Sequence, residues 1–121
     1  MEEHIAEKAI AERYLDEMLE AERTRDFKAW SKRWDTNDLG DLDDKAFQSD
    51  LDAMNQKLGA YKSRAYFGVL KGHRDVSQKK KTSVSLQFVW RVIYEKREAL
   101  SIVGIRQREG GWHPYKNVCH L

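Results

Sequence analysis

The sequence predicts an α+β domain in which three N-terminal helices pack on a mainly antiparallel four-stranded sheet. Apolar residues recur every three or four positions over residues 3–58, as expected for amphipathic helices. From residue 61 onward they alternate with polar residues, as expected for strands with one buried face. The two patterns divide the chain once, so the architecture is helices first and a sheet afterwards. Its 121 residues, with a single proline and 35% charged residues, fit one globular domain spanning 1–121.

The first helix is predicted over residues 3–22, because one apolar stripe runs along an otherwise charged segment. That stripe consists of Ile5, Ala6, Ala9, Ile10, Tyr14, Met18 and Leu19. After a break at 24–26, Asp26 is predicted to cap a short second helix that carries Phe27, Trp30 and Trp34 on one side.

Residues 35–41 are rich in Asp, Asn and Gly and are predicted to form a loop. The third helix is expected to begin at Asp43 or Asp44 and to end at Leu58. Gly59 follows it in a position typical of a left-handed helix end.

Four strands are predicted at 61–69, 83–94, 99–108 and 112–118. Residues 72–82 form a polar connection, 95–98 a turn, and Gly110-Gly111 a hairpin turn. Pro114 lacks an amide proton, which places it on an edge strand or at a bulge.

The strand at 83–94 has the clearest alternation. It is expected to direct Leu86, Phe88, Trp90 and Val92 toward the helices and Val89, Arg91 and Ile93 to the outer face. A slip of one residue would instead turn Gln87, Val89 and Arg91 inward and make a polar pocket.

This order of elements resembles the nuclear-transport-factor-2-like superfamily, and so do two local segments. Residues 14–34 resemble the first helix of that family and the short helix after it, and residues 58–64 resemble the entry to its first long strand. The segment 106–112 is similar to the last hairpin of small bacterial members whose domain has no assigned function. The resemblance implies a cone-shaped fold with a curled, cystatin-like sheet, and dimers through the outer sheet face. Such relatives are often exported.

The function expected from these features is non-catalytic: a homodimeric domain that binds a small apolar or partly polar molecule or meets a protein partner. The residues predicted to line the ligand cavity are Tyr14, Met18, Trp30, Trp34, Phe88 and Trp90. The residues predicted to form the dimer interface are Val89, Arg91 and Ile93, since outward apolar residues on a central strand often mark a partner surface.

An enzyme of the isomerase or dehydratase type is the first alternative, so enzymatic activity stays open. The resemblance implies a helix tyrosine as hydrogen-bond donor, and Tyr14 occupies that position. Asp35 or Asp38 are the available bases, but neither has a reason to be buried. The strand acid expected near residues 103–105 is missing. Tyr14 acting only as a core aromatic is the favoured interpretation.

Polyanion binding is the second alternative. Residues 1–60 hold 9 Lys and Arg against 16 Asp and Glu, whereas residues 61–121 hold 13 against 4. The basic half, with Lys79-Lys80-Lys81, is a weak signal for nucleic acid because three lysines make few phosphate contacts.

No cofactor and no metal are expected. His113, Cys119 and His120 lie close in sequence, but adjacent residues of an extended segment point to opposite faces, and the segment is expected to be an exposed tail. Cys119 has no evident partner that would activate it as a nucleophile. A single cysteine, no membrane-spanning apolar run and no visible secretory signal predict a cytoplasmic protein, or an exported one if a leader was removed.

Overall fold

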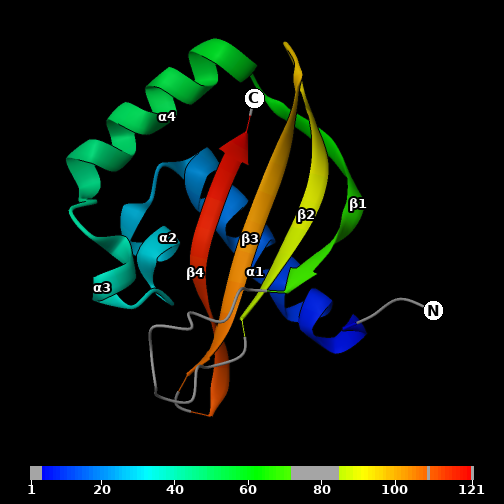
Figure 1. The fold of residues 1–121 in the computed structure, drawn as a ribbon. Helices are drawn as coiled ribbons and strands as arrows, with labels where there is room; N and C mark the ends of the chain where they lie inside the picture. The colour runs from blue at the N-terminus through cyan, green and yellow to red at the C-terminus, as the bar shows by residue number, and fades with distance from the viewer. Residues whose placement is uncertain (1–3, 72–84, 109, 121) are drawn as a thin grey trace.

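The computed structural model describes residues 4–71, 85–108 and 110–120, and it confirms the α+β class. The helices are α1 (Ile5–Thr24), α2 (Phe27–Ser31), α3 (Thr36–Leu39) and α4 (Asp44–Leu58). The strands are β1 (Tyr61–Lys71), β2 (Ser85–Tyr94), β3 (Glu98–Arg108) and β4 (Gly111–His120). They form one antiparallel, curved and unclosed sheet in the order β1-β2-β3-β4 (Figure 1). The predicted connection at 72–82, including Lys79-Lys80-Lys81, lies outside the described residues.

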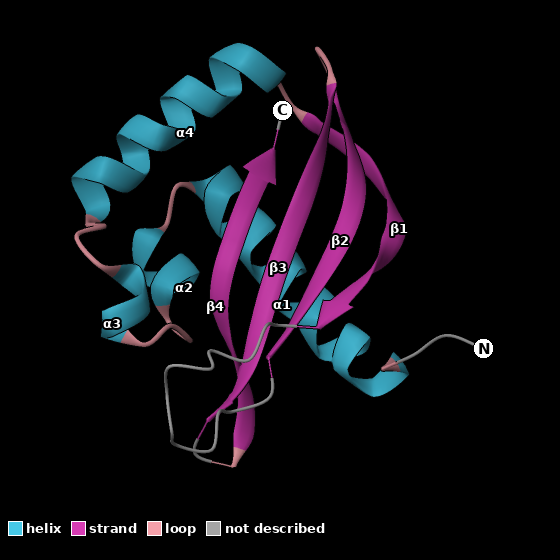
Figure 2. Cartoon of the chain, viewed as in Figure 1, coloured by secondary structure: helices cyan, strands magenta, loops and turns pink. Residues whose placement is uncertain are grey.

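The helix α1 crosses one face of the sheet, while α2, α3 and α4 lie beyond the β4 edge (Figure 2). Its buried residues are Ala11, Tyr14, Leu15, Met18 and Ala21. The buried face of α1 is thus rotated slightly from the predicted apolar stripe. Ile5, at the start of the helix, is 60% exposed. The reason is local: Ile5 lies in the first turn of α1, before the helix reaches the centre of the sheet.

Aspartate side chains begin the three later helices. Asp26 accepts a hydrogen bond from the Ala29 amide at 3.1 Å, as predicted for its helix cap. Asp43, predicted only as a possible first residue of the later helix, caps that helix by accepting from the Ala46 amide at 2.8 Å. The predicted loop at 35–41 is partly wrong, because Asp35 accepts from the Asn37 amide and caps the one-turn helix α3.

The end of α4 differs in detail from the prediction. Gly59 has φ +77° and ψ −157°, so its φ is positive as expected but its ψ lies outside the left-handed helical region. Residues with a side chain rarely adopt this combination. The Gly59 amide still bonds to the Asn55 carbonyl at 2.9 Å, and the Lys96 amide bonds to the Leu58 carbonyl at 2.8 Å. The chain therefore ends α4 against the β2–β3 turn.

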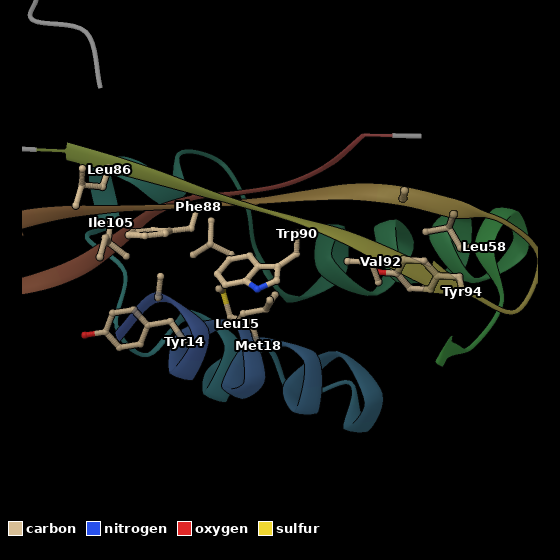
Figure 3. Packing of buried hydrophobic residues seen from close by; sticks show 13 residues of the cluster. Tyr14, Leu15, Met18, Leu58, Leu86, Phe88, Trp90, Val92, Tyr94 and Ile105 are labelled. Carbon is tan, nitrogen blue, oxygen red and sulfur yellow. The ribbon is translucent and has the colours of Figure 1, made fainter. Parts of the chain in front are cut away.

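The predicted phase of the central strand is confirmed. Leu86, Phe88, Trp90 and Val92 are each at most 2% exposed and face α1 (Figure 3). Pro114 lies on the edge strand β4, where a register shift interrupts its pairing with β3, so both expectations for Pro114 hold.

One expectation for the outer face is wrong. Val89 alternates with the inward residues and lies on the outer face, yet it is only 6% exposed. Its partners on the neighbouring strands are Gly68 of β1 and Ile102 of β3.

Candidate functional site

Two hollows in the described residues lie beneath α4. A cavity of about 410 Å³ lies between α1, α4 and the strands β2 to β4, and another of about 460 Å³ lies between α1, α4 and the start of β1. Both are lined by Leu19, Glu22 and Met54, so they adjoin at the middle of the two helices. We call the two cavities together the α4 groove.

The helix α4 is attached to the rest of the molecule at both ends and through Leu51 and Met54 in its middle. At its N-terminal end the Phe47 ring packs on Phe27 and Trp30 of α2, with ring centroids 5.3 and 5.6 Å away. At its C-terminal end Leu58 is fully buried in the core. Figure 1 shows α4 standing off from the sheet between these attachments.

An ion pair adds a tie between α1 and α4. The guanidinium of Arg25, the residue that ends α1, donates to the Asp52 carboxylate at 2.6 Å and to the Gln48 side chain at 3.0 Å. Gln48 in turn donates to the Arg25 carbonyl at 2.8 Å. These contacts fix how far α4 stands from the end of α1.

Glu22 is the ionisable group at the centre of the α4 groove. The indole Nε1–H of Trp30 donates to its Oε2 at 3.1 Å. Burial raises the pKa of Glu22 to about 7, although the Trp30 hydrogen bond acts in the opposite direction. Near neutral pH this carboxyl group therefore exists in both protonation states, which allows it to accept a proton, donate one or pair with a cation.

Tyr94 and Cys119 border the same cavity from β2 and β4. Burial raises the pKa of Tyr94 far above its usual range, with smaller contributions from the neighbouring Cys119 and Glu22 charges. Burial also raises the pKa of the Cys119 thiol, which a hydrogen bond with Tyr94 partly offsets. Both groups are therefore neutral at physiological pH, and Cys119 is not an activated thiolate.

Two further polar side chains, Ser101 on β3 and Asn117 on β4, line this part of the groove. The Asn117 amide donates to the Met18 sulfur at 3.4 Å, and Ser101 is the only buried polar residue among the described ones, at 5% exposure. The apolar part of the wall includes Leu15, Leu19 and Met54. The cavity thus offers apolar surface and neutral hydrogen-bonding groups around Glu22, with the charged side chains of Asp50 and Lys57 on the α4 wall.

The six residues predicted to line a cavity are divided by the structure. Met18, Phe88 and Trp90 are at most 3% exposed and fill the core between α1 and the sheet (Figure 3). Trp30 alone of the six lines the α4 groove. Its ring stacks on Trp34 with centroids 5.1 Å apart, and the buried Trp34 Nε1 has no hydrogen-bond partner among the described residues.

Tyr14 is likewise held in the core. Its hydroxyl donates to the Trp112 carbonyl at 2.6 Å, and its side chain borders a hollow of only about 10 Å³. That space is near the lower limit for a single water molecule. The two loop carboxylates are also engaged: Asp35 caps α3, and Asp38 accepts from Arg106 at 2.6 Å.

The outer sheet face carries the predicted interface residues together with neighbours from β3. Ile93 is 36% exposed, and Leu100, opposite Arg91, is 39% exposed. Arg91 forms an ion pair with Glu98 at 2.8 Å on the same face. The exposed apolar area is thus interrupted by one ion pair.

The C-terminal segment is not the exposed tail that the sequence suggested. It continues β4 to His120, and Cys119 is partly buried because it pairs with Ser101 on the inner face. Among the described residues, no three His, Cys, Asp or Glu side chains gather in a way that would hold a metal ion. No helix in the described part of the chain has the length and hydropathy needed to cross a membrane.

The sequence contained signals for the residues that the prediction missed. Glu22 follows Met18 by four positions, so it prolongs the buried stripe of α1 with a carboxylate. Tyr94 continues the inward alternation of β2, two residues after Val92.

Comparisons with protein-family models, curated proteins and solved structures found no match for this chain.

Proposed function

We propose that the protein is a non-catalytic binding domain that holds a small amphipathic molecule in the α4 groove. The observation that carries this proposal is the groove itself, with cavities of about 410 and 460 Å³. Volumes of this size are typical of small-molecule sites. Mostly apolar walls with a few polar groups, here Glu22, Tyr94 and Asn117, are also typical of such sites.

Binding of a neutral apolar fluorophore, N-phenyl-1-naphthylamine, tests the proposal. We expect a saturable increase in its emission with one molecule bound per chain. Ala53 is exposed on α4 and lines the groove, so Ala53→Trp should place an indole in the cavity and abolish the signal.

Ser49→Trp is the matched control, because Ser49 is exposed on the same helix and lines neither cavity. This variant should bind the fluorophore as the unmodified protein does. Absence of saturable binding, or equal binding by the two tryptophan variants, would overturn the proposal.

We further propose membership of the nuclear-transport-factor-2-like superfamily. Its support is the order of a long first helix, short second helix and later helix before a curved antiparallel sheet. The support remains architectural, and a solved relative with the same order and register would test it.

Homodimerisation through the outer sheet face is a separate proposal. It is supported by the exposed Ile93 and Leu100 side chains on the middle strands. Sedimentation velocity should give a dimer for the unmodified chain and a monomer for Ile93→Lys, which adds a like charge near Arg91. A monomer for the unmodified chain at every concentration would refute this proposal.

A further inference from the structure

We propose that the molecule held in the α4 groove carries an organic ammonium group that pairs with the Glu22 carboxylate. This inference rests on the proposed binding function and specifies the chemical class of the ligand. It predicts an alkyl or arylalkyl amine whose apolar part contacts Leu15, Leu19 and Met54.

The hydrogen bonding of the Glu22 carboxylate is incomplete. An ionised carboxylate offers acceptor sites for about four hydrogen bonds. In the part of the chain that the structure describes, Glu22 accepts one, from Trp30 at 3.1 Å, and forms no ion pair. A carboxylate in such surroundings is stabilised by a ligand that brings a positive charge and several N–H donors.

The arginines that border the groove form ion pairs with other carboxylates. Arg23 pairs with Glu20, and Arg25 pairs with Asp52. Arg64 donates to Glu12 at 3.0 Å and to Asp16 at 2.7 Å. The cation for Glu22 therefore has to come from outside these pairs.

The neutral groups around the Glu22 carboxylate do not compensate its negative charge. Tyr94 and Cys119 are protonated at physiological pH and cannot supply a positive charge. Lys57 lines the same cavity from α4 with an exposed side chain, and Asp50, about two turns of helix before it, lines it as well. A cation that enters the cavity of about 410 Å³ thus meets two carboxylates, Glu22 and Asp50, and one lysine.

Competition with the bound fluorophore distinguishes ligand classes at equal chain length. Octylamine, 1-octanol and octanoate differ only in the head group, so they present an ammonium, a hydroxyl and a carboxylate to the same site. At about pH 8 we expect octylamine to displace the fluorophore at a concentration roughly tenfold lower than 1-octanol, as a charge-assisted hydrogen bond implies. Octanoate should be weaker than both.

Glu22→Gln should remove the preference for octylamine while leaving 1-octanol unchanged, because glutamine keeps the acceptor for Trp30 and loses the charge. Glu17→Gln is the matched control on the same helix, because Glu17 lines neither cavity, and it should retain the preference. Unchanged 1-octanol binding also shows that each variant keeps the groove intact.

The preference should depend on pH through Glu22. Octylamine affinity should rise about tenfold from about pH 6 to about pH 8, as the carboxyl group ionises around its pKa of about 7. Other charged or titratable groups face the groove from α1, α4, β1, β2 and β4: Asp16, Glu20, Arg23, Arg25, Asp50, Lys57, Tyr61, Arg64, Tyr94 and Cys119. Glu22→Gln separates their contribution, since it should flatten the pH profile.

Equal affinities for octylamine and 1-octanol, or a preference that survives in Glu22→Gln, would overturn the assignment. In either case the fluorophore still binds and is still blocked by Ala53→Trp, so the binding function stands alone. Loss of fluorophore binding altogether refutes the binding function instead.

Discussion

Replacing Glu22 by glutamine should stabilise the protein at alkaline pH and leave its stability nearly unchanged at acidic pH. In the folded chain the pKa of Glu22 is about 7, compared with 4.5 for an ordinary glutamate. Each tenfold change in proton affinity is worth about 1.4 kcal/mol, so the difference corresponds to about 3 kcal/mol. The carboxyl group is partly buried rather than sealed from water, so about 3 kcal/mol is the upper value for the change in unfolding free energy.

The direction of the pH effect on stability depends on whether the folded or the unfolded chain binds the Glu22 proton more tightly. Below about pH 4.5 the group is protonated in both the folded and the unfolded chain, and it imposes no cost. As the pH rises, the unfolded chain releases its proton first, so the free energy of unfolding falls up to about pH 7 and then levels off. Glutamine carries no proton to lose, so the variant lacks this decline.

Urea denaturation of both proteins at about pH 5, 6, 7 and 8.5 measures the difference in unfolding free energy. We expect the difference to grow to about 2–3 kcal/mol in favour of the variant, the size set by the proton affinity. Glu17→Gln is the control on the same helix. The Arg33 hydrogen bond lowers the pKa of Glu17 below its ordinary value of 4.5, so its contribution to stability is fully present at all four pH values. Glu17→Gln should therefore be less stable than the unmodified protein by an amount that stays constant from about pH 5 to 8.5.

A difference for Glu22→Gln that stays constant from about pH 5 to 8.5 would refute the reasoning. It would mean that water reaches the carboxylate freely in the folded protein. The rise of octylamine affinity between about pH 6 and pH 8 would then no longer be expected, although the competition with 1-octanol would still test the ammonium proposal.

Two further changes test the packing and the helix caps. Trp90→Ala removes the largest fully buried side chain and should lower the free energy of unfolding by about 3–5 kcal/mol. Phe67→Ala is the control, because Phe67 is 73% exposed. Equal urea midpoints for the two variants would contradict the assigned strand phase. Asp43→Ala removes the acceptor for the Ala46 amide and should cost about 1 kcal/mol, a loss that Asp43→Asn should largely avoid if the capping oxygen is the cause.

The elements that the sequence predicted are those decided by neighbours along the chain. A helix cap such as Asp26 depends on an amide three residues away, and the inward direction of Phe88 and Trp90 depends on strict alternation. The bulge at Pro114 follows from its missing amide proton. Each of these needs little information about distant parts of the molecule.

The features that the sequence did not predict depend on distant contacts. Val89 was expected to be exposed on the outer face, and its side chain is only 6% exposed. The α4 groove depends on where α4 is fastened, which is set by pairs such as Arg25 with Asp52 and Phe47 with Trp30. These residues lie 27 and 17 positions apart, and no periodic pattern relates them.

The aromatic residues explain why the ligand space lies outside the core. Phe88 and Trp90 were proposed to fill the core and also to line a cavity, but with 0% and 1% exposure they leave no room beside them. The walls of the groove carry charged side chains, Glu22 on α1 and Asp50 and Lys57 on α4. Drawing α4 onto α1 would bury these charges at a cost of several kcal/mol. The carboxylate that opposes closure is also the group that a cationic ligand would neutralise, so binding of such a ligand should favour a closer approach of α4.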